Sequence, residues 1–428
     1  MAAEKIIQFL WKHQLNRKKL LHCTCGLELV VLDPGEQNFH AGPDFFNARI
    51  KLGNMIWAGN IEVHQRASDW YRHSHHINPA YNNVILHVVG DYDADIYNSL
   101  GRRIHTLQPD YPEALIQRYL ALKNNEDWLP CGNYLNEFPA TKLKKWLDQL
   151  MIQRAQIKSQ NLFKLSPDII RNREEALYRA LASGYGLSLN CLPFELLSKK
   201  IPLNKLSLFR DNLFDLEALF YGHSGLLYPA KNLGSYPSSL WDRYSELLHL
   251  VKGDPVPIHL WKFLRLRPAS FPTLRISQFV NKLHLRMPLL ENILSIRSLG
   301  ELEQFLRVNA SAYWDNHYLF GKCSPPCEKQ LGQHAVHTLI INVIIPFLQA
   351  LDQIEPRKSS KNTVVFLSQM KAESNRIIRN WHSQGIRAKN AGESQALLQL
   401  FNVYCKQKRC LDCQIGAGLL EASIYEKQ

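Results

Sequence analysis

The sequence predicts an α+β protein in which a small α/β domain, residues 1–112, precedes a large all-helical region, residues 113–428. Apolar runs of strand length, bounded by glycine, proline and asparagine turns, are concentrated in the first of these regions. From Tyr111 onward, segments with a 3.6-residue apolar period dominate. Nine of the 17 histidines also fall within residues 1–112, so we expect the chemistry of the protein to be there.

The front domain is predicted to run in the order helix, strand, hairpin, helix and buried strand. Apolar residues at helical spacing predict the first helix, and the tight turn Gly53-Asn54 predicts the hairpin. The nearly continuous apolar run from Val84 to Val89 is typical of a strand that is buried on both faces. The predicted elements cover residues 4–15, 27–32, 45–52, 55–65, 70–76 and 84–89. This order predicts helices packed on a small mixed sheet.

Helical segments fill the rest of the chain, and prolines separate several of them. No clear internal repeat relates these segments to one another. The predicted helices cover residues 141–160, 173–182, 213–220, 299–306, 328–351, 363–383 and 394–404. The polar spacer formed by residues 355–362 is predicted to be a surface loop.

Charge is distributed unevenly along the chain. Residues 1–112 hold 11 basic and 11 acidic residues, so the net charge of +13 belongs entirely to residues 113–428. A basic region of this size indicates a polyanionic partner, and nucleic acid is the partner that we expect. The alternative is a solvated basic surface that only aids solubility.

Several features predict a cytoplasmic protein that is not embedded in a membrane. The N-terminus lacks the apolar core and the cleavage site of a signal peptide. The most apolar segment, residues 338–348, is too short to span a bilayer and contains Asn342 and Pro346. Nine cysteines are an odd number, which does not suggest a disulfide framework. No sequence feature specifies an oligomeric state.

Three polar residues of the predicted hairpin form the main candidate catalytic site. Asp44 precedes the first strand, and Glu62 and His64 lie two apart on the return strand, so both point to the same face. Two carboxylates bind Mg²⁺ or Mn²⁺ through oxygen, and a neighbouring basic side chain can orient the attacking water. The structural alternative is that Glu62 pairs with Arg49 across the hairpin while Asp44 caps a turn.

This arrangement resembles the PD-(D/E)xK nuclease core, with Pro43-Asp44 as the first element and Glu62-Val63-His64 as the second. The helix and the buried strand that follow agree with the order of elements in that core. The resemblance implies a restriction-endonuclease-like fold and a metal-dependent phosphodiesterase activity. In two respects the sequence departs from the pattern: His64 stands where a lysine is usual, and Asp44 lies at the entrance of its strand.

Further candidate site residues surround these motifs. Asn38 begins the segment that leads to Asp44. His73 and His76 are three residues apart on one face of a short predicted helix, where they can line a cleft. His87 lies in an apolar strand, either as a hydrogen-bonded core histidine or as part of the site. With a carboxylate and His64, either His73 or His76 would complete a zinc site, although no HExxH motif is present.

A series of longer motifs runs along the chain. In the front domain these are GPDFFNARI, WAGNIEVH, SDWYRHSHH and YNNVILHVV; later ones are LRLRPASFPTLRISQF, LIINVIIP and YCKQKRCLDCQIG. The series is similar to a bacterial family of proteins of unknown function, domain of unknown function 2851. The resemblance covers nearly the whole chain and implies no activity.

Cysteines cluster in two places in the helical region. Cys405, Cys410 and Cys413 form a C-x4-C-x2-C motif, and Cys323 and Cys327 form a C-x3-C motif. Three close thiolates together with the more distant Cys323 predict a zinc or iron–sulfur site. The alternative is that these thiols are small core residues.

Three arginines, Arg265, Arg267 and Arg275, bracket a loop that contains prolines. They are candidate phosphate ligands, because guanidinium groups bind phosphate in a bidentate manner. They can equally satisfy helix C-termini or acidic neighbours. The chain lacks a P-loop, a GxGxxG motif and a nucleophile elbow, which argues against the enzyme classes that use them.

These observations give three functional hypotheses. The first is a metal-dependent phosphodiesterase acting on nucleic acid, with Asp44 and Glu62 as metal ligands and His64 at the attacking water or the phosphate. The second is a non-catalytic nucleic-acid-binding or scaffold protein, which the absent lysine favours. The third is a zinc-dependent hydrolase of small molecules that uses the front histidines.

Overall fold

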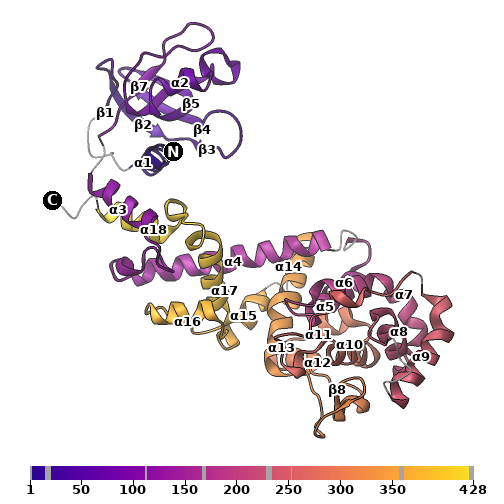
Figure 1. Cartoon of the computed structure of the whole chain (residues 1–428). Helices are drawn as coiled ribbons and strands as arrows, with labels where there is room; N and C mark the ends of the chain where they lie inside the picture. The colour runs from indigo at the N-terminus through magenta and orange to yellow at the C-terminus, as the bar shows by residue number, and fades with distance from the viewer. Residues whose placement is uncertain are drawn as a thin grey trace. The chain divides into compact units, whose positions relative to one another are not determined.

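The computed structural model describes most of the chain: residues 2–14, 21–110, 113–165, 170–227, 234–251, 253–355 and 361–423. It consists of two compact units, one formed by residues 1–146 with 400–428 and the other by residues 147–399 (Figure 1). The predicted boundary after residue 112 adjoins residues 111–112, which lie outside the described residues, as does most of the predicted loop at 355–362. Both therefore stay predictions.

A mixed β-sheet forms the centre of the first unit. Within the described residues, its strands are β1 (Leu21–His22), β2 (Glu28–Asp33), β3 (Glu36–Gln37), β4 (Phe45–Leu52), β5 (Met55–Arg66), β6 (Val84–Asp91) and β7 (His105–Leu107). They lie in the order β1-β2-β4-β5-β6-β7, with β3 beside β4. The β4–β5 hairpin is antiparallel, whereas β5, β6 and β7 are parallel. The predicted mixed sheet is confirmed.

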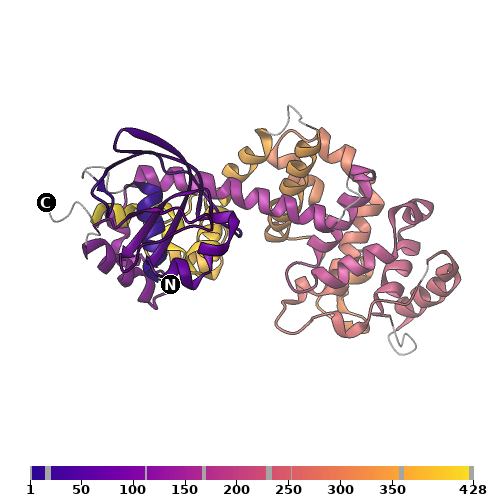
Figure 2. The same cartoon turned by 90° about the horizontal axis from the view of Figure 1, so that it is seen from above.

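Alternating side chains on β5 separate an apolar face of the sheet from a polar one. Helix α1 (Ala2–His13) covers the apolar face in both views, and its Ile7 packs in one cluster with Ile61 and Val63 (Figure 1, Figure 2). Glu62 and His64 therefore project from the opposite face. That face carries α2 (Asp69–Arg72), followed by the 3₁₀ turns η1 (His75–Ile77) and η2 (Pro79–Tyr81).

The C-terminal segment of the chain returns to the first unit. Its elements are η13 (Leu400–Cys405), η14 (Cys410–Asp412) and α18 (Gln414–Ser423). Helix α18 packs against η14, α3 (Glu113–Asn124) and η3 (Gly132–Glu137). Helix α4 (Ala140–Leu165) begins in this unit and continues into the second.

The second unit is largely helical, as predicted, and has one large hydrophobic core. Its α-helices are α5 (Arg173–Tyr185), α6 (Cys191–Lys200), α7 (Leu203–Leu206), α8 (Leu213–Ser224), α9 (Ser235–Leu247), α10 (Pro272–Arg286), α11 (Leu289–Ser295), α12 (Leu299–Leu306), α13 (Gln333–Leu339), α14 (Ile345–Ile354), α15 (Lys361–Gln369), α16 (Arg376–Ser383) and α17 (Ala391–Gln399). A hairpin of β8 (His317–Leu319) and β9 (Lys322–Cys323) interrupts the helices.

Two of the long predicted helices differ in the structure, and a third, predicted over residues 328–351, begins only at Gln333. The segment predicted as one helix over residues 363–383 is two helices, because Asn375 caps a new helix by accepting a hydrogen bond from the amide of Ile378. The segment predicted over 394–404 begins at Ala391 and ends as the π-helical turn η13. Neither a polar helix cap nor a π-helical turn interrupts the helical spacing of apolar residues, so this spacing alone did not reveal them.

One described stretch, Gln333–Ile354, is long and apolar enough to cross a membrane. It joins α13, the π-helical turn η11 (Ile340–Ile344) and α14, with Pro346 in the first turn of α14. In the structure, 67% of its most apolar window is buried inside the protein. The stretch therefore serves as a core helix of the second unit.

Candidate metal centre

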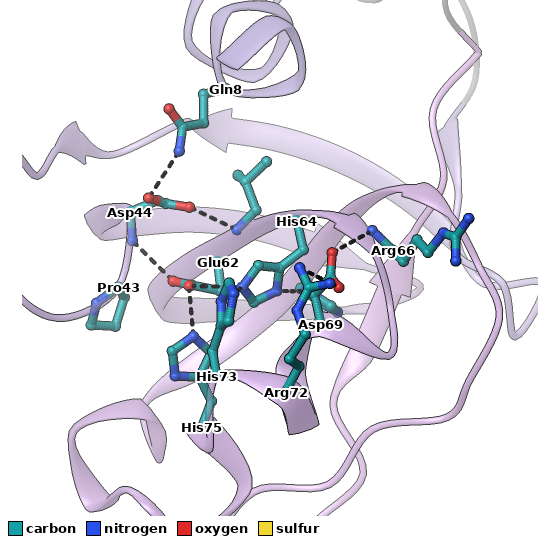
Figure 3. Close-up of polar contacts among 12 residues, drawn as sticks. Gln8, Pro43, Asp44, Glu62, His64, Arg66, Asp69, Arg72, His73 and His75 are labelled. Carbon is teal, nitrogen blue, oxygen red and sulfur yellow. Dashed lines mark hydrogen bonds and ion pairs between the residues drawn. The ribbon is translucent and has the colours of Figure 1, made fainter. Parts of the chain in front are cut away.

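Asp44 and Glu62 lie side by side at the entrance of the β4–β5 hairpin. The antiparallel register pairs Phe45 with Ile61, so the residue before β4 falls beside Glu62. The amide of Asp44 donates to Oε2 of Glu62 at 3.1 Å, and Oδ2 of Asp44 accepts from the amide of Val63 at 2.9 Å. Nε2 of Gln8, on α1, donates to Oδ1 of Asp44 at 3.0 Å (Figure 3). Backbone and α1 together fix both carboxylates.

Three histidines converge next to Glu62. Within the described part of the chain, His64, His73 and His75 form the one group of histidine, cysteine or acidic residues in which three ligand atoms lie within 4.8 Å of one another. Nε2 of His64 is 3.1 Å from Nδ1 of His73. Oε1 of Glu62 is 3.2 Å from Nε2 of His75 and 3.5 Å from Nε2 of His64 (Figure 3). Three imidazoles and one carboxylate therefore face a common point.

A break in the helix after β5 brings these histidines together. The sequence predicted a helix through residue 76 with His73 and His76 on one face, but α2 ends at Arg72. Ser74 then adopts a left-handed conformation, with φ of 61°, so helical spacing no longer applies. As a result His75 joins His73, whereas the ring of His76 packs 5.1 Å from Tyr71. His75 was missed because nothing in the sequence required Ser74 to be left-handed.

His87 supports the centre from the neighbouring strand. The parallel register of β5 and β6 places His87 beside Glu62, and Nε2 of His87 lies 2.8 Å from Nδ1 of His64. His87 is fully buried, and its ring packs 5.5 Å from that of Trp70. The ring of Tyr81 stacks on the ring of His75, with 3.8 Å between the ring centroids. Aromatic packing thus restricts the orientation of the imidazoles.

Burial keeps the inner histidines neutral. It lowers the pKa of His64 to about 2, with further lowering from His87, His75 and His73. It lowers the pKa of His87 to about 3, and it lowers the pKa of His75 as well. Neutral imidazole is the form that binds a metal ion. The centre is therefore set for ligation rather than for holding a positive charge.

Burial shifts the pKa of the carboxyl groups in the opposite direction, upward. It raises the pKa of Asp44 to about 7, with a further increase from the nearby Glu62. It raises the pKa of Glu62 to about 8, although the hydrogen bond from the amide of Asp44 lowers it. Near neutral pH these groups can accept or release a proton, as acid–base chemistry requires.

The remaining front-domain candidates have structural surroundings. Nδ2 of Asn38 donates to the carbonyls of His40 and Pro43, and its backbone amide donates to the carbonyl of Asp44, so it shapes the loop that delivers that residue. Arg49 lies opposite Ala58, on the strand pair but away from Glu62 in register. The alternative pairing of Glu62 with Arg49 is thus wrong.

The three arginines do not form one phosphate clamp. Arg265 and Arg267 are exposed before α10. Arg275 is buried within α10, where Nη1 donates to Oε1 of Gln278 at 3.1 Å and burial lowers its pKa to about 10. Because Arg275 lies on the buried face of α10, at most two of the three candidates can reach a phosphate in solution.

The cysteine candidates are divided between the two units. Cys405, Cys410 and Cys413 belong to the first unit together with Cys131, which sequence analysis did not single out. Cys323 belongs to the second unit, where its sulfur lies 3.6 Å from Nε2 of His317. The Cys131 thiol contributes to the raised pKa of Cys405, and the thiols of Cys413 and Cys410 contribute to the raised pKa of Cys131.

Comparison with known proteins identifies one family. The sequence model described as "Protein of unknown function (DUF2851)" matches residues 4–376, which include the whole histidine centre and end before Cys405. No curated protein matches the chain. No solved structure matches it either.

Proposed function

The chain belongs to the family of proteins of unknown function DUF2851, and we propose that it is a metal-dependent phosphodiesterase that acts on nucleic acid. One observation carries this proposal: ring nitrogens of His64, His73 and His75 lie within 4.8 Å of one another beside the Glu62 carboxylate. Three histidines and a carboxylate are a donor set that suits zinc or manganese.

The residues of the centre divide into ligands and proton carriers. His64, His73 and His75 would bind the metal through nitrogen, and Glu62 through oxygen. A bound divalent metal ion lowers the pKa of its water and supplies a nucleophile near neutral pH. Asp44, whose pKa burial raises to about 7, would accept a proton from the attacking water. His73 is exposed, so a substrate can approach the centre from its side.

A phosphodiester substrate is proposed from a motif resemblance and from charge. Pro43-Asp44 and Glu62-Val63-His64 resemble in sequence the two elements of a PD-(D/E)xK nuclease motif. The net charge of +13 favours an extended polyanion over a small neutral substrate. His64 in place of the usual lysine adds a ligand that this chain combines with His73 and His75.

A second candidate function follows from the same ligands. Imidazole nitrogen suits zinc better than magnesium, and a zinc ion in such a centre also hydrolyses small esters and amides. This alternative, a zinc-dependent hydrolase of small molecules, uses the same residues and differs only in the substrate.

The test is a cleavage assay on labelled single- and double-stranded DNA and RNA. The full chain is incubated with Zn²⁺, Mn²⁺, Mg²⁺ or EDTA, beside Glu62→Ala and the matched control His76→Ala. The proposal expects metal-dependent cleavage that is lost in Glu62→Ala and kept in His76→Ala. Absence of cleavage with salt-sensitive binding of nucleic acid would support a binding protein instead. Hydrolysis of small esters alone would support the second candidate.

A further inference from the structure

Four cysteines from distant parts of the sequence meet in the first unit. Cys131 immediately precedes η3, Cys405 ends η13, Cys410 begins η14, and Cys413 lies between η14 and α18. Helix α18 packs on η14, α3 and η3, which brings the C-terminal segment back to the segment that begins after Cys131. Figure 1 shows α18 beside α3. The contact between α18 and η14 is close, since a Cβ on Gly416 of α18 would lie 2.2 Å from the carbonyl oxygen of Cys410.

The four thiols share one buried environment. Cys131 and Cys413 are buried, and Cys405 and Cys410 are half-buried. Burial raises the pKa of Cys131 to about 12, and Cys413 and Cys410 raise it further. The pKa of Cys405 is raised by burial and then by Cys413, Cys131 and Cys410. Thiols that act on one another in this way lie near one another, as the packing of α18 requires.

Donors of hydrogen bonds to sulfur are already in place. Cys413 immediately precedes α18; burial raises the pKa of this thiol, and the amides of Gly416 and Ile415 in the first turn of α18 partly lower it. The buried indole N–H of Trp146 is directed at the Cys413 sulfur, and this hydrogen bond also lowers the pKa of the thiol. N–H groups directed at sulfur stabilise metal-bound thiolate rather than neutral thiol.

We propose that this group binds an iron–sulfur cluster, with four ligands: Cys131, Cys405, Cys410 and Cys413. The C-x4-C-x2-C spacing is that of plant-type iron–sulfur proteins, although their fourth cysteine follows this motif and Cys131 precedes it here.

The cluster would act as a structural clamp. Assembly takes iron and sulfide from solution, and each cysteine releases its thiol proton when it ligates. Lys408, which lowers the pKa of Cys410, offsets part of the negative charge of the thiolates. Ligation would join residues 400–423 to residues 113–146 of the same unit. This inference is independent of the histidine centre, since the two sites share no residue.

The experiment uses the full chain purified without oxygen and, in parallel, reconstituted with ferric iron and sulfide. Iron, acid-labile sulfide and zinc are measured, together with visible absorbance before and after dithionite. The variants are Cys131→Ser and Cys410→Ser, with Cys323→Ser and Cys191→Ser as matched controls. The expected result is iron and sulfide with a visible absorbance that dithionite bleaches. The contents of iron and of sulfide should both fall at least tenfold in Cys131→Ser and Cys410→Ser. They should stay at the wild-type level in Cys323→Ser and Cys191→Ser.

Three results would overturn the inference. Two zinc ions per wild-type chain without iron would replace the cluster by a zinc site, since the histidine centre accounts for one of them, and no iron after reconstitution would remove the cluster. Loss of iron in Cys323→Ser with retention in Cys131→Ser would assign the fourth ligand to Cys323. The wild-type measurement decides the first two even if a variant fails to fold. His75→Ala, which removes a ligand of the histidine centre, should retain its iron.

Discussion

His64 and His87 lie on two neighbouring parallel strands, and Nδ1 of His64 is 2.8 Å from Nε2 of His87. The planes of the two rings meet at 79°. In the tautomer in which Nδ1–H of His64 donates a hydrogen bond to Nε2 of His87, Nε2 of His64 carries a lone pair. This lone pair points toward His73 and Glu62. Metal-binding histidines commonly donate their other N–H in this way, and the donation fixes the tautomer. His87 therefore has a role in the centre without contacting the metal.

We first expect His87→Phe to weaken metal binding while leaving the ligands intact. The change removes the acceptor for His64, and loss of such an outer partner typically lowers metal affinity about 10–100-fold. The affinity for Zn²⁺ is measured by competition with a chelator. His76→Phe serves as the control because His76 packs against Tyr71, outside the centre. Equal affinity in wild type and His87→Phe would show that His87 is only a core residue.

Asp44→Asn should reduce cleavage without destabilising the fold. Asparagine keeps an oxygen for the amide of Val63 but cannot take a proton from water, so the rate should fall about 100-fold or more. Because burial raises the pKa of Asp44 to about 7, the ionised group is unfavourable in the fold at pH 8. The midpoint of thermal unfolding at pH 8 should therefore stay the same or rise. A clear fall in that midpoint would mean that Asp44 is structural.

A buried lysine of the second unit should make the stability of the fold depend on pH. Nζ of Lys282 donates to the carbonyls of Phe305 and Arg307, and burial lowers its pKa from 10.5 to about 7. Between these values the unfolded chain binds more protons than the folded one, so this residue makes stability rise with pH. The contribution is at most about 1.4 kcal/mol per pH unit.

The free energy of unfolding is measured at several values between pH 7 and 9 for wild type and Lys282→Met. The slope with pH should be smaller in the variant. Lys199→Met, at an exposed lysine paired with Glu195, should keep the wild-type slope. Parallel slopes in all three proteins would show that Lys282 keeps an ordinary pKa in the fold.

Local patterns in the sequence were enough to predict the sheet and part of the centre. The turn at Gly53-Asn54 set the hairpin register, and strand alternation put Glu62 and His64 on one face, as the structure has them. His75 could not be predicted, because its position depends on the left-handed Ser74. Cys131 could not be paired with Cys410 either, since that contact depends on how α18 packs on η3.

The most direct test of the histidine centre is the zinc content of three full-length proteins after loading and desalting: wild type, His75→Ala and His76→Ala. Any zinc held by the cysteines is common to all three, so only the differences between proteins count. If His64, His73 and His75 bind a metal ion, His75→Ala holds one zinc ion less per chain than wild type, and His76→Ala holds the same amount. Equal zinc in wild type and His75→Ala would contradict the metal centre and, with it, the proposed hydrolysis.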